Sequence, residues 1–241
     1  MKIALVQFQP KAGDLAYNAE RHRYWIRQAH TQGAGVVIFS ELSLTSYEPD
    51  LAADLSVEAN DKLWQSWQAL SNELQLSFGL GMPIRTKQGI VIGLVLFQPD
   101  KPHRIYAKQF LHADEEPFFV PGTDWDGYWA AHQIALAICY ELSVEAHAEQ
   151  VLCHPAQMYL ASVAKFENGI APAYQRLAEL ARSYQIPTMM VNAVGPADGG
   201  LCTGQSAVWN AEGNMIGQLA ADEEACLLFD SQTNEVLILR S

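Results

Sequence analysis

Three side chains with useful chemistry stand directly after three apolar segments of the sequence. Glu41 follows residues 36–40, Lys108 follows residues 105–107, and Cys139 follows residues 134–138. A thiol is a nucleophile, a carboxylate can act as its base, and an ammonium can stabilise a developing negative charge. Since sites in open α/β sheets form where strands end, the three side chains can meet there. Taken singly, each also fits an ordinary role as a solvated loop residue or a buried cysteine.

The first half of the chain supplies alternating strand and helix patterns that would position Glu41 and Lys108. Leu63, Trp67, Leu70 and Leu74 have helical spacing. The other predicted elements are strands over residues 3–8, 36–39 and 77–82, a helix over residues 18–31, and a hairpin of residues 89–97 and 103–106. Residues 109–127 have neither period and predict a long loop, which in a compact domain is typical of a functional segment.

The second half continues with a strand that leads to Cys139. Ser143 is predicted to cap the helix that follows, and Pro172 is predicted to stand near the first turn of a later one. The predicted helices cover residues 144–152 and 172–184, and the strands cover residues 133–138, 158–163, 188–191, 206–209, 215–219 and 226–229. Strands, helices and hairpins without a low-complexity linker predict one α/β domain over residues 1–241 with a mixed sheet system.

Composition and charge exclude several classes of function. The 241 residues are 49% hydrophobic and 17% charged, which is typical of a globular chain with a large core. Acidic residues exceed basic ones, and the formal net charge of -12 makes nucleic acid and anionic membranes poor partners. The sequence has no apolar stretch that would span a bilayer and no signal-peptide pattern, so a cytoplasmic location is expected.

The motifs of several enzyme classes are missing from the sequence. It contains no G-x-G-x-x-G, no Walker loop, no H-E-x-x-H and no G-x-S-x-G. The cysteines are too few and scattered for a disulfide framework. His147, Cys153 and His154 do not have a usual zinc spacing, so a metal site is not expected.

The segments around the three candidate residues resemble the nitrilase superfamily, also called carbon-nitrogen hydrolases. Residues 39–47 (FSELSLTSY) resemble the Phe-Pro-Glu-x-x-x-Thr-Gly-Tyr motif of that family. Residues 106–122 resemble its lysine segment, and residues 138–141 (ICYE) resemble its nucleophile elbow. The resemblance continues through residues 191–195, 204–206 and 229–230, so it covers nearly the whole chain in the right order. It implies the α/β class and the four-layer α-β-β-α sandwich of the family.

The resemblance implies a Glu-Lys-Cys triad. Glu41 would be the general base, Lys108 the cation that faces the oxyanion, and Cys139 the nucleophile. The backbone N–H of Tyr140 would be a second oxyanion donor. Cys153, Cys202 and Cys226 match no catalytic position and are interpreted as packing residues.

A second glutamate in the lysine segment is also implied. Many amidases of the family carry a glutamate that positions the substrate, and Glu116 is preferred for this role because the segment after it keeps the family register. Its neighbour Glu115 is the rival. Tyr47 closes the first motif and is expected to line the substrate pocket, with simple packing as the alternative.

The sequence departs from the family pattern at several positions. Ser40 stands where the family usually has Pro, Ser46 where it has Gly, and Glu141 where it most often has Asp. Residues 143–146 (SVEA) replace the common Arg-aromatic-Pro-Glu segment, which puts support of the nucleophile and substrate preference in question.

The resemblance implies a cofactor-free amidase that hydrolyses a small linear amide or an N-carbamoyl compound and releases ammonia. A homodimer or a higher homo-oligomer is expected, because the family commonly pairs subunits. The alternatives are a small-molecule binding protein with the same fold but no activity, and a nitrile hydrolase, which would use the same triad.

Overall fold

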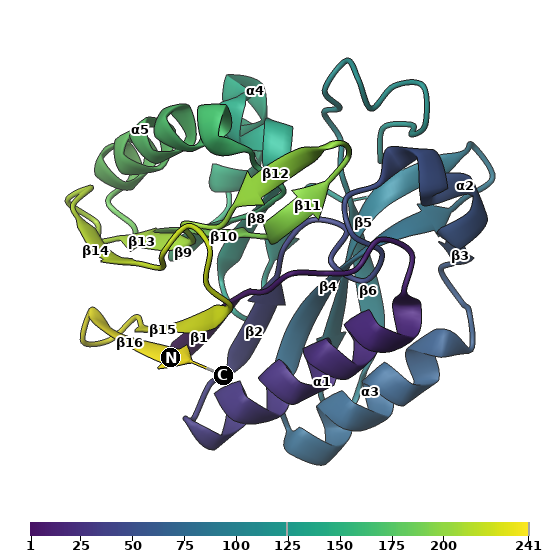
Figure 1. Ribbon diagram of the computed structural model, residues 1–241. Coiled ribbons are helices and arrows are strands. Elements are labelled where there is room, and N and C mark those ends of the chain that lie inside the picture. Colours follow the sequence, from purple (N-terminus) through teal and green to yellow (C-terminus); the bar gives the residue numbers. More distant parts are fainter. Residues whose placement is uncertain (124, 241) are drawn as a thin grey trace.

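The computed structural model describes residues 1–123 and 125–240. Asp124, within the predicted loop, and Ser241, the last residue of the predicted domain, lie outside the described residues. The larger of two main sheets has eight strands and contains the N-terminal strand β1 (Figure 1). Its spatial order is β16 (Glu235–Arg240), β15 (Ala225–Asp230), β1 (Lys2–Gln7), β2 (Val36–Phe39), β4 (Ser77–Arg85), β5 (Ile90–Gln98) and β6 (Lys101–Ala107), with β3 (Val57–Glu58) beside β4.

The second main sheet has six strands and contains the strand that leads to Cys139. Its spatial order is β14 (Met215–Gln218), β13 (Ala207–Trp209), β10 (Thr188–Asn192), β9 (Met158–Val163), β8 (Ile134–Ile138) and β7 (Tyr128–Trp129). The strands β8, β9 and β10 are parallel, so their carboxyl ends lie at one edge. A separate hairpin is formed by β11 (Val194–Ala197) and β12 (Gly200–Thr203).

Helices cover the outer face of each main sheet (Figure 1). The first sheet is covered by α1 (Leu15–Thr31) and α3 (Leu63–Leu74), and the second by α4 (Glu145–Leu152) and α5 (Glu167–Tyr184). Short helical turns complete the chain: η1 (Pro49–Leu51), α2 (Ala52–Leu55) and η2 (Cys139–Ser143). Asp14 caps α1 by accepting a 3.0 Å hydrogen bond from the backbone N–H of Tyr17.

The alternation of side chains along the strands builds three apolar layers. In β8, Ile134, Leu136 and Ile138 belong to the core between the two sheets, whereas Ala135 and Ala137 pack beneath α4 and α5. The strand β1 divides its side chains in the same way between the central core and the layer under α1 and α3. The predicted four-layer α-β-β-α sandwich is therefore confirmed.

Most predicted elements are confirmed, and three helix starts are wrong. The helix α1 begins at Leu15, three residues before the predicted start at residue 18. Val144, not Ser143, occupies the N-cap position of α4, because Ser143 still belongs to η2. The helix α5 begins at Glu167, so Pro172 lies inside it. The missing N–H of Pro172 costs one intrahelical hydrogen bond, while Ile170, Ala173 and Leu177 keep the helix face buried.

The predicted loop between β6 and β7 contains no helix or strand in its described residues. Within residues 1–123 and 125–240, no helix is both long and apolar enough to cross a bilayer.

Candidate active site

Glu41 is held at the carboxyl end of β2 by a turn that packs closely on β4. The backbone N–H of Gly81 donates to Ser43 Oγ at 3.1 Å, and the N–H of Leu44 donates to the Gly81 carbonyl at 3.0 Å. A Cβ atom at position 81 would lie 2.3 Å from the backbone nitrogen of Leu42, so only glycine permits this approach. The Glu41 side chain is consequently fixed in the interior, with a relative exposure of 2%.

Lys108 follows β6 and is fixed through its own backbone. Its N–H donates to the Ile92 carbonyl at 2.9 Å, and its carbonyl accepts a 2.7 Å hydrogen bond from the N–H of Gly122. A side chain at Gly122 would overlap the backbone of Ala107, which is 2.4 Å from the position of a Cβ atom. The long loop therefore closes back onto the lysine, whose side chain is fully buried.

The Lys108 ammonium lies between two carboxylates. Its Nζ atom is 2.8 Å from Glu41 Oε1 and 2.6 Å from Glu115 Oε1. The hydroxyl of Tyr47 donates to the same Glu115 oxygen at 3.0 Å. The backbone N–H of His112 donates to the other Glu115 oxygen at 2.8 Å. The structure thus brings together Glu41, Lys108 and Tyr47 from among the predicted site residues.

The preference for Glu116 over Glu115 is corrected by this geometry. Glu115 is 1% exposed and contacts Lys108, whereas the next residue in the chain, Glu116, is exposed. The N–H groups of Phe118 and Phe119 donate to the Glu115 carbonyl, and this tight turn directs the side chain of Glu115 inward. Adjacent residues in such a turn point in different directions.

Cys139 stands at a sharp turn between β8 and η2. Its φ of 44° lies in the left-handed region, which a residue with a side chain adopts at an energetic cost. Such strain clusters at functional sites because the surrounding structure must hold it in place. The Sγ atom is 3.9 Å from the carbonyl oxygen of Ala164, at the end of the neighbouring strand β9.

Burial and charge set the protonation of the three candidate residues. Burial raises the pKa of Cys139 to about 11, as does the charge of Glu41, while Lys165 and Lys108 oppose the rise. Burial also raises the pKa of Glu41, against the opposing effect of Lys108. For Lys108, burial lowers the pKa, but Glu41, Cys139 and Glu115 outweigh it, so the group stays charged. At neutral pH the resting cysteine is therefore a thiol that needs a base.

Glu41 has one carboxylate oxygen available for that task. Its Oε1 atom is bound by Lys108, whereas Oε2 is buried and has no hydrogen-bond partner within the described residues. The Cys139 side chain lies near Glu41. Burial is the chief cause of the raised pKa of Glu41, and the interaction with Cys139 lowers that pKa. An acceptor without a donor, beside a thiol with a raised pKa, is arranged to receive the thiol proton.

Glu141, a departure from the family pattern whose role the sequence did not predict, lies at the candidate site. Its side chain accepts hydrogen bonds from the N–H of Ile138 at 2.7 Å, from the N–H of Gln109 at 2.6 Å and from the Tyr106 hydroxyl at 2.8 Å. The side chain is fully buried. Its place two residues after the candidate nucleophile was the available signal.

Arg176 of α5 supports the altered segment after the elbow. Its Nε atom donates to the Leu142 carbonyl at 3.3 Å, and its Nη2 atom lies 2.7 Å from a carboxylate oxygen of Glu145. These contacts join α5 to η2 and to the start of α4. The replaced segment at residues 143–146 therefore has support from a different helix.

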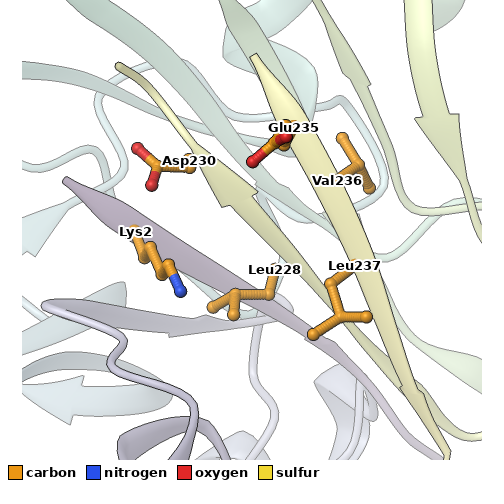
Figure 2. A pocket seen from close by; sticks show the side chains of 6 residues that line it. All are labelled: Lys2, Leu228, Asp230, Glu235, Val236 and Leu237. Atoms are coloured by element: carbon orange, nitrogen blue, oxygen red, sulfur yellow. The ribbon is translucent and has the colours of Figure 1, made fainter. Parts of the chain in front are cut away.

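The surface cavities differ in their relation to these residues. One, of about 510 Å³, is bordered by Glu116, Tyr140 and Gln109, and the last two residues directly follow Cys139 and Lys108 in the chain. Tyr140 is 37% exposed there. Another, of about 380 Å³, lies at the edge formed by β1, β15 and β16 and contains none of the predicted catalytic residues (Figure 2). Its lining residues are Lys2, Leu228, Asp230, Glu235, Val236 and Leu237.

Comparison with solved structures shows where else this fold occurs. An amidase from Nesterenkonia sp. AN1, in a variant with acrylamide added at its active-site cysteine, superposes with a TM-score of 0.84 at 22% identity, covering 95% of this chain and 92% of the other. A second variant, in complex with butyramide, superposes with a TM-score of 0.83 at 22% identity, covering 95% and 89%. At this identity the likeness establishes the shared fold.

Comparison of sequences identifies the family. A glutamine-dependent NAD(+) synthetase from Acinetobacter baylyi is 25% identical over 237 residues, which are 92% of this chain. The chain spans only 42% of the length of that synthetase. The family description "Carbon-nitrogen hydrolase" matches residues 2–236, which confirms the resemblance seen in the motifs. With that match over nearly its whole length, the chain belongs to the carbon-nitrogen hydrolase family.

Proposed function

We propose that this carbon-nitrogen hydrolase is an amidase that acts on a small linear amide or an N-carbamoyl compound through a thioester on Cys139. The observation that carries the proposal is the contact of the Lys108 ammonium with Glu41 Oε1 at 2.8 Å, beside a thiol whose pKa depends on both charges. A base, a cation and a nucleophile are the groups that amide hydrolysis requires.

The first half of the reaction forms the thioester and releases ammonia. Glu41 takes the thiol proton as the sulfur attacks the amide carbon, and the carbonyl electron pair moves to oxygen. Lys108 and the N–H of Tyr140 stabilise this oxyanion. When the intermediate collapses, the C–N bond breaks and Glu41 gives its proton to the departing nitrogen, which leaves as ammonia.

The second half hydrolyses the thioester. Glu41, ionised again, takes a proton from water as the water oxygen attacks the acyl carbon. The C–S bond then breaks, Cys139 takes back the proton from Glu41, and the carboxylic acid leaves. The sum is amide plus water giving carboxylic acid plus ammonia, so no cofactor is needed.

The position of Glu115 favours an amide substrate over a nitrile substrate. Its carboxylate is buried against Lys108 and Tyr47, and a carboxylate accepts the hydrogen bonds that an amide N–H₂ group donates. A nitrile has no N–H to offer. A nitrile hydrolase remains the second candidate because it would use the same nucleophile, base and cation.

The test is ammonia release from matched amide and nitrile pairs, with Cys139→Ala as the inactive control. Release from amides at a rate well above that from the nitriles, and lost in Cys139→Ala, is the expected result. Faster release from the nitriles would replace the amidase proposal with the nitrile hydrolase. No release from either series would favour a binding protein without activity.

A further inference from the structure

A second lysine stands beside Cys139 and has no role in the reaction described above. Lys165 follows β9, which is parallel to β8 in a register that pairs Ile138 with Ser162. The residues that leave the two strands therefore lie next to each other. The carbonyl of Ala164, directly before Lys165, is the group 3.9 Å from the Cys139 sulfur.

The backbone of Lys165 is fixed by a buried amide side chain. Its N–H donates to Asn192 Oδ1 at 2.8 Å, and its carbonyl accepts from Asn192 Nδ2 at 3.0 Å and from the Thr203 N–H at 3.2 Å. Asn192 is fully buried at the end of β10. The lysine is thus part of a rigid strand end, which favours a precise role for its side chain.

The Lys165 ammonium differs from that of Lys108 in its partners. Lys108 contacts two carboxylates, whereas no ion pair or hydrogen bond of Lys165 Nζ exists within residues 1–123 and 125–240. The pKa of Cys139 is raised chiefly by burial, and among the cations that oppose this rise Lys165 has a larger effect than Lys108. A positive charge that has no anionic partner among the described residues consequently lies near the nucleophile.

We propose that Lys165 binds a carboxylate group of the substrate, so that the preferred substrates are monoamides of short dicarboxylic acids. This inference rests on the proposed amidase function. The amide end of the substrate would lie between Cys139 and Lys108, and the carboxylate would contact Lys165.

The charges of the site explain why such a substrate needs this lysine. Glu41 and Glu115 together carry two negative charges, and Lys108 compensates one of them. An anionic substrate would be repelled by the remaining charge unless a separate cation received its carboxylate. Lys165 is partly buried as a residue, which suits this role because a contact with a carboxylate is less screened there than on an open surface.

The first experiment measures binding without turnover. Succinamate and butyramide are a matched pair, since a carboxylate in the first replaces a methyl group in the second. Titration calorimetry with Cys139→Ala is expected to show tighter binding of succinamate. Adding Lys165→Met should reduce the ratio of the two affinities by about 10- to 100-fold, as expected for a hydrogen bond to a charged group. Lys165→Arg should keep part of the preference.

The control is Lys87→Met, which removes an exposed lysine from the turn between β4 and β5 and should leave the affinity ratio unchanged. Equal affinities of succinamate and butyramide, or a ratio that survives Lys165→Met, would overturn the inference.

The second experiment measures kcat/KM for both amides with Cys139 intact. A fall in the succinamate to butyramide ratio in Lys165→Met, through KM, supports the inference. A loss of kcat that is equal for both amides would show that Lys165 acts on the thiol instead, and would overturn it. If neither amide is hydrolysed but the affinity ratio depends on Lys165, the amidase proposal fails and the carboxylate site stands.

Discussion

Glu141 accepts a 2.6 Å hydrogen bond from the backbone N–H of Gln109, the residue that follows Lys108. Its other carboxylate oxygen accepts a 2.7 Å hydrogen bond from the N–H of Ile138, the residue that precedes Cys139. One buried side chain therefore joins the backbones beside the candidate cation and the candidate nucleophile, which come from different sheets. We interpret Glu141 as a positioning residue.

Replacing Glu141 by Gln should lower both stability and activity. The carboxylate faces N–H donors with both oxygens, so the amide N–H₂ of Gln would oppose one of them. A loss of about 2 kcal/mol in the free energy of unfolding is expected, with a lower kcat. Denaturant unfolding and steady-state kinetics check this, with Tyr106→Phe as a control that removes one donor and leaves both backbone contacts. An unchanged kcat would argue against the positioning role.

The pH dependence of stability provides a separate check on Glu141. Burial raises its pKa from 4.5 to about 7, against the effect of the N–H donors. Between these pH values the folded protein binds more protons than the unfolded chain, so the contribution of Glu141 to stability falls as the pH rises from about 4.5 to about 7. The difference in the free energy of unfolding between the wild type and Glu141→Gln should therefore become smaller as the pH rises from about 4.5 to about 7. A constant difference would contradict the assignment.

Glu115→Gln should impair amide hydrolysis far more than Glu116→Gln. The first change removes a buried charge 2.6 Å from Lys108 Nζ, and breaking such a contact costs several kcal/mol, which is about 100-fold or more in kcat/KM if it serves the transition state. The second change affects an exposed residue and should stay within about 3-fold. An effect confined to Glu116 would show that Glu116, not Glu115, serves the reaction.

Lys108, Glu41 and Cys139 should act as one unit. The Lys108→Arg variant should be inactive, because a planar guanidinium does not replace a compact ammonium held between Glu41 and Glu115. Double variants of the three residues should be little worse than the single ones. Double-mutant cycles of kcat/KM measure this. If the fold-losses of the single variants multiply in the double variants, the residues do not share a transition state.

Ser46→Gly should stabilise the fold. Ser46 has a φ of 66° in the left-handed region, and its buried hydroxyl has no hydrogen-bond partner within the described residues. Glycine, which the family motif usually has here, removes both costs, and an increase of about 1 kcal/mol in the free energy of unfolding is expected. Thermal unfolding checks this, and a decrease would contradict the strain at this position.

The sequence was sufficient for those parts of the fold that depend on periodic burial. The alternating side chains of β8 and the helical spacing of apolar residues in α3 follow from which faces are buried. The predicted ends of the strands then indicated where Glu41, Lys108 and Cys139 would lie. The hairpin of β11 and β12 and the edge strand β16 were missed. Glycines and a proline weaken the strand pattern in the hairpin, and β16 has only partly buried or exposed side chains.

Side-chain direction in the loop was beyond what the sequence could predict. The two adjacent glutamates have the same chemistry, and only the turn that binds the Glu115 carbonyl decides which side chain reaches Lys108. Lys165 was also missed, because a lysine after a strand has the pattern of an ordinary loop residue. Its place beside Cys139 depends on the parallel pairing of β8 and β9, which joins segments separated in the chain.

The most direct test of a thioester on Cys139 is the intact mass of the protein after rapid quenching with a short amide. The wild type is expected to gain the mass of the acyl group, with the adduct located at Cys139 by peptide mapping. Cys139→Ala should show no adduct, whereas Ala at the exposed Cys153 should leave it in place. Turnover of the amide by Cys139→Ala, or an acyl adduct on another cysteine, would contradict Cys139 as the nucleophile.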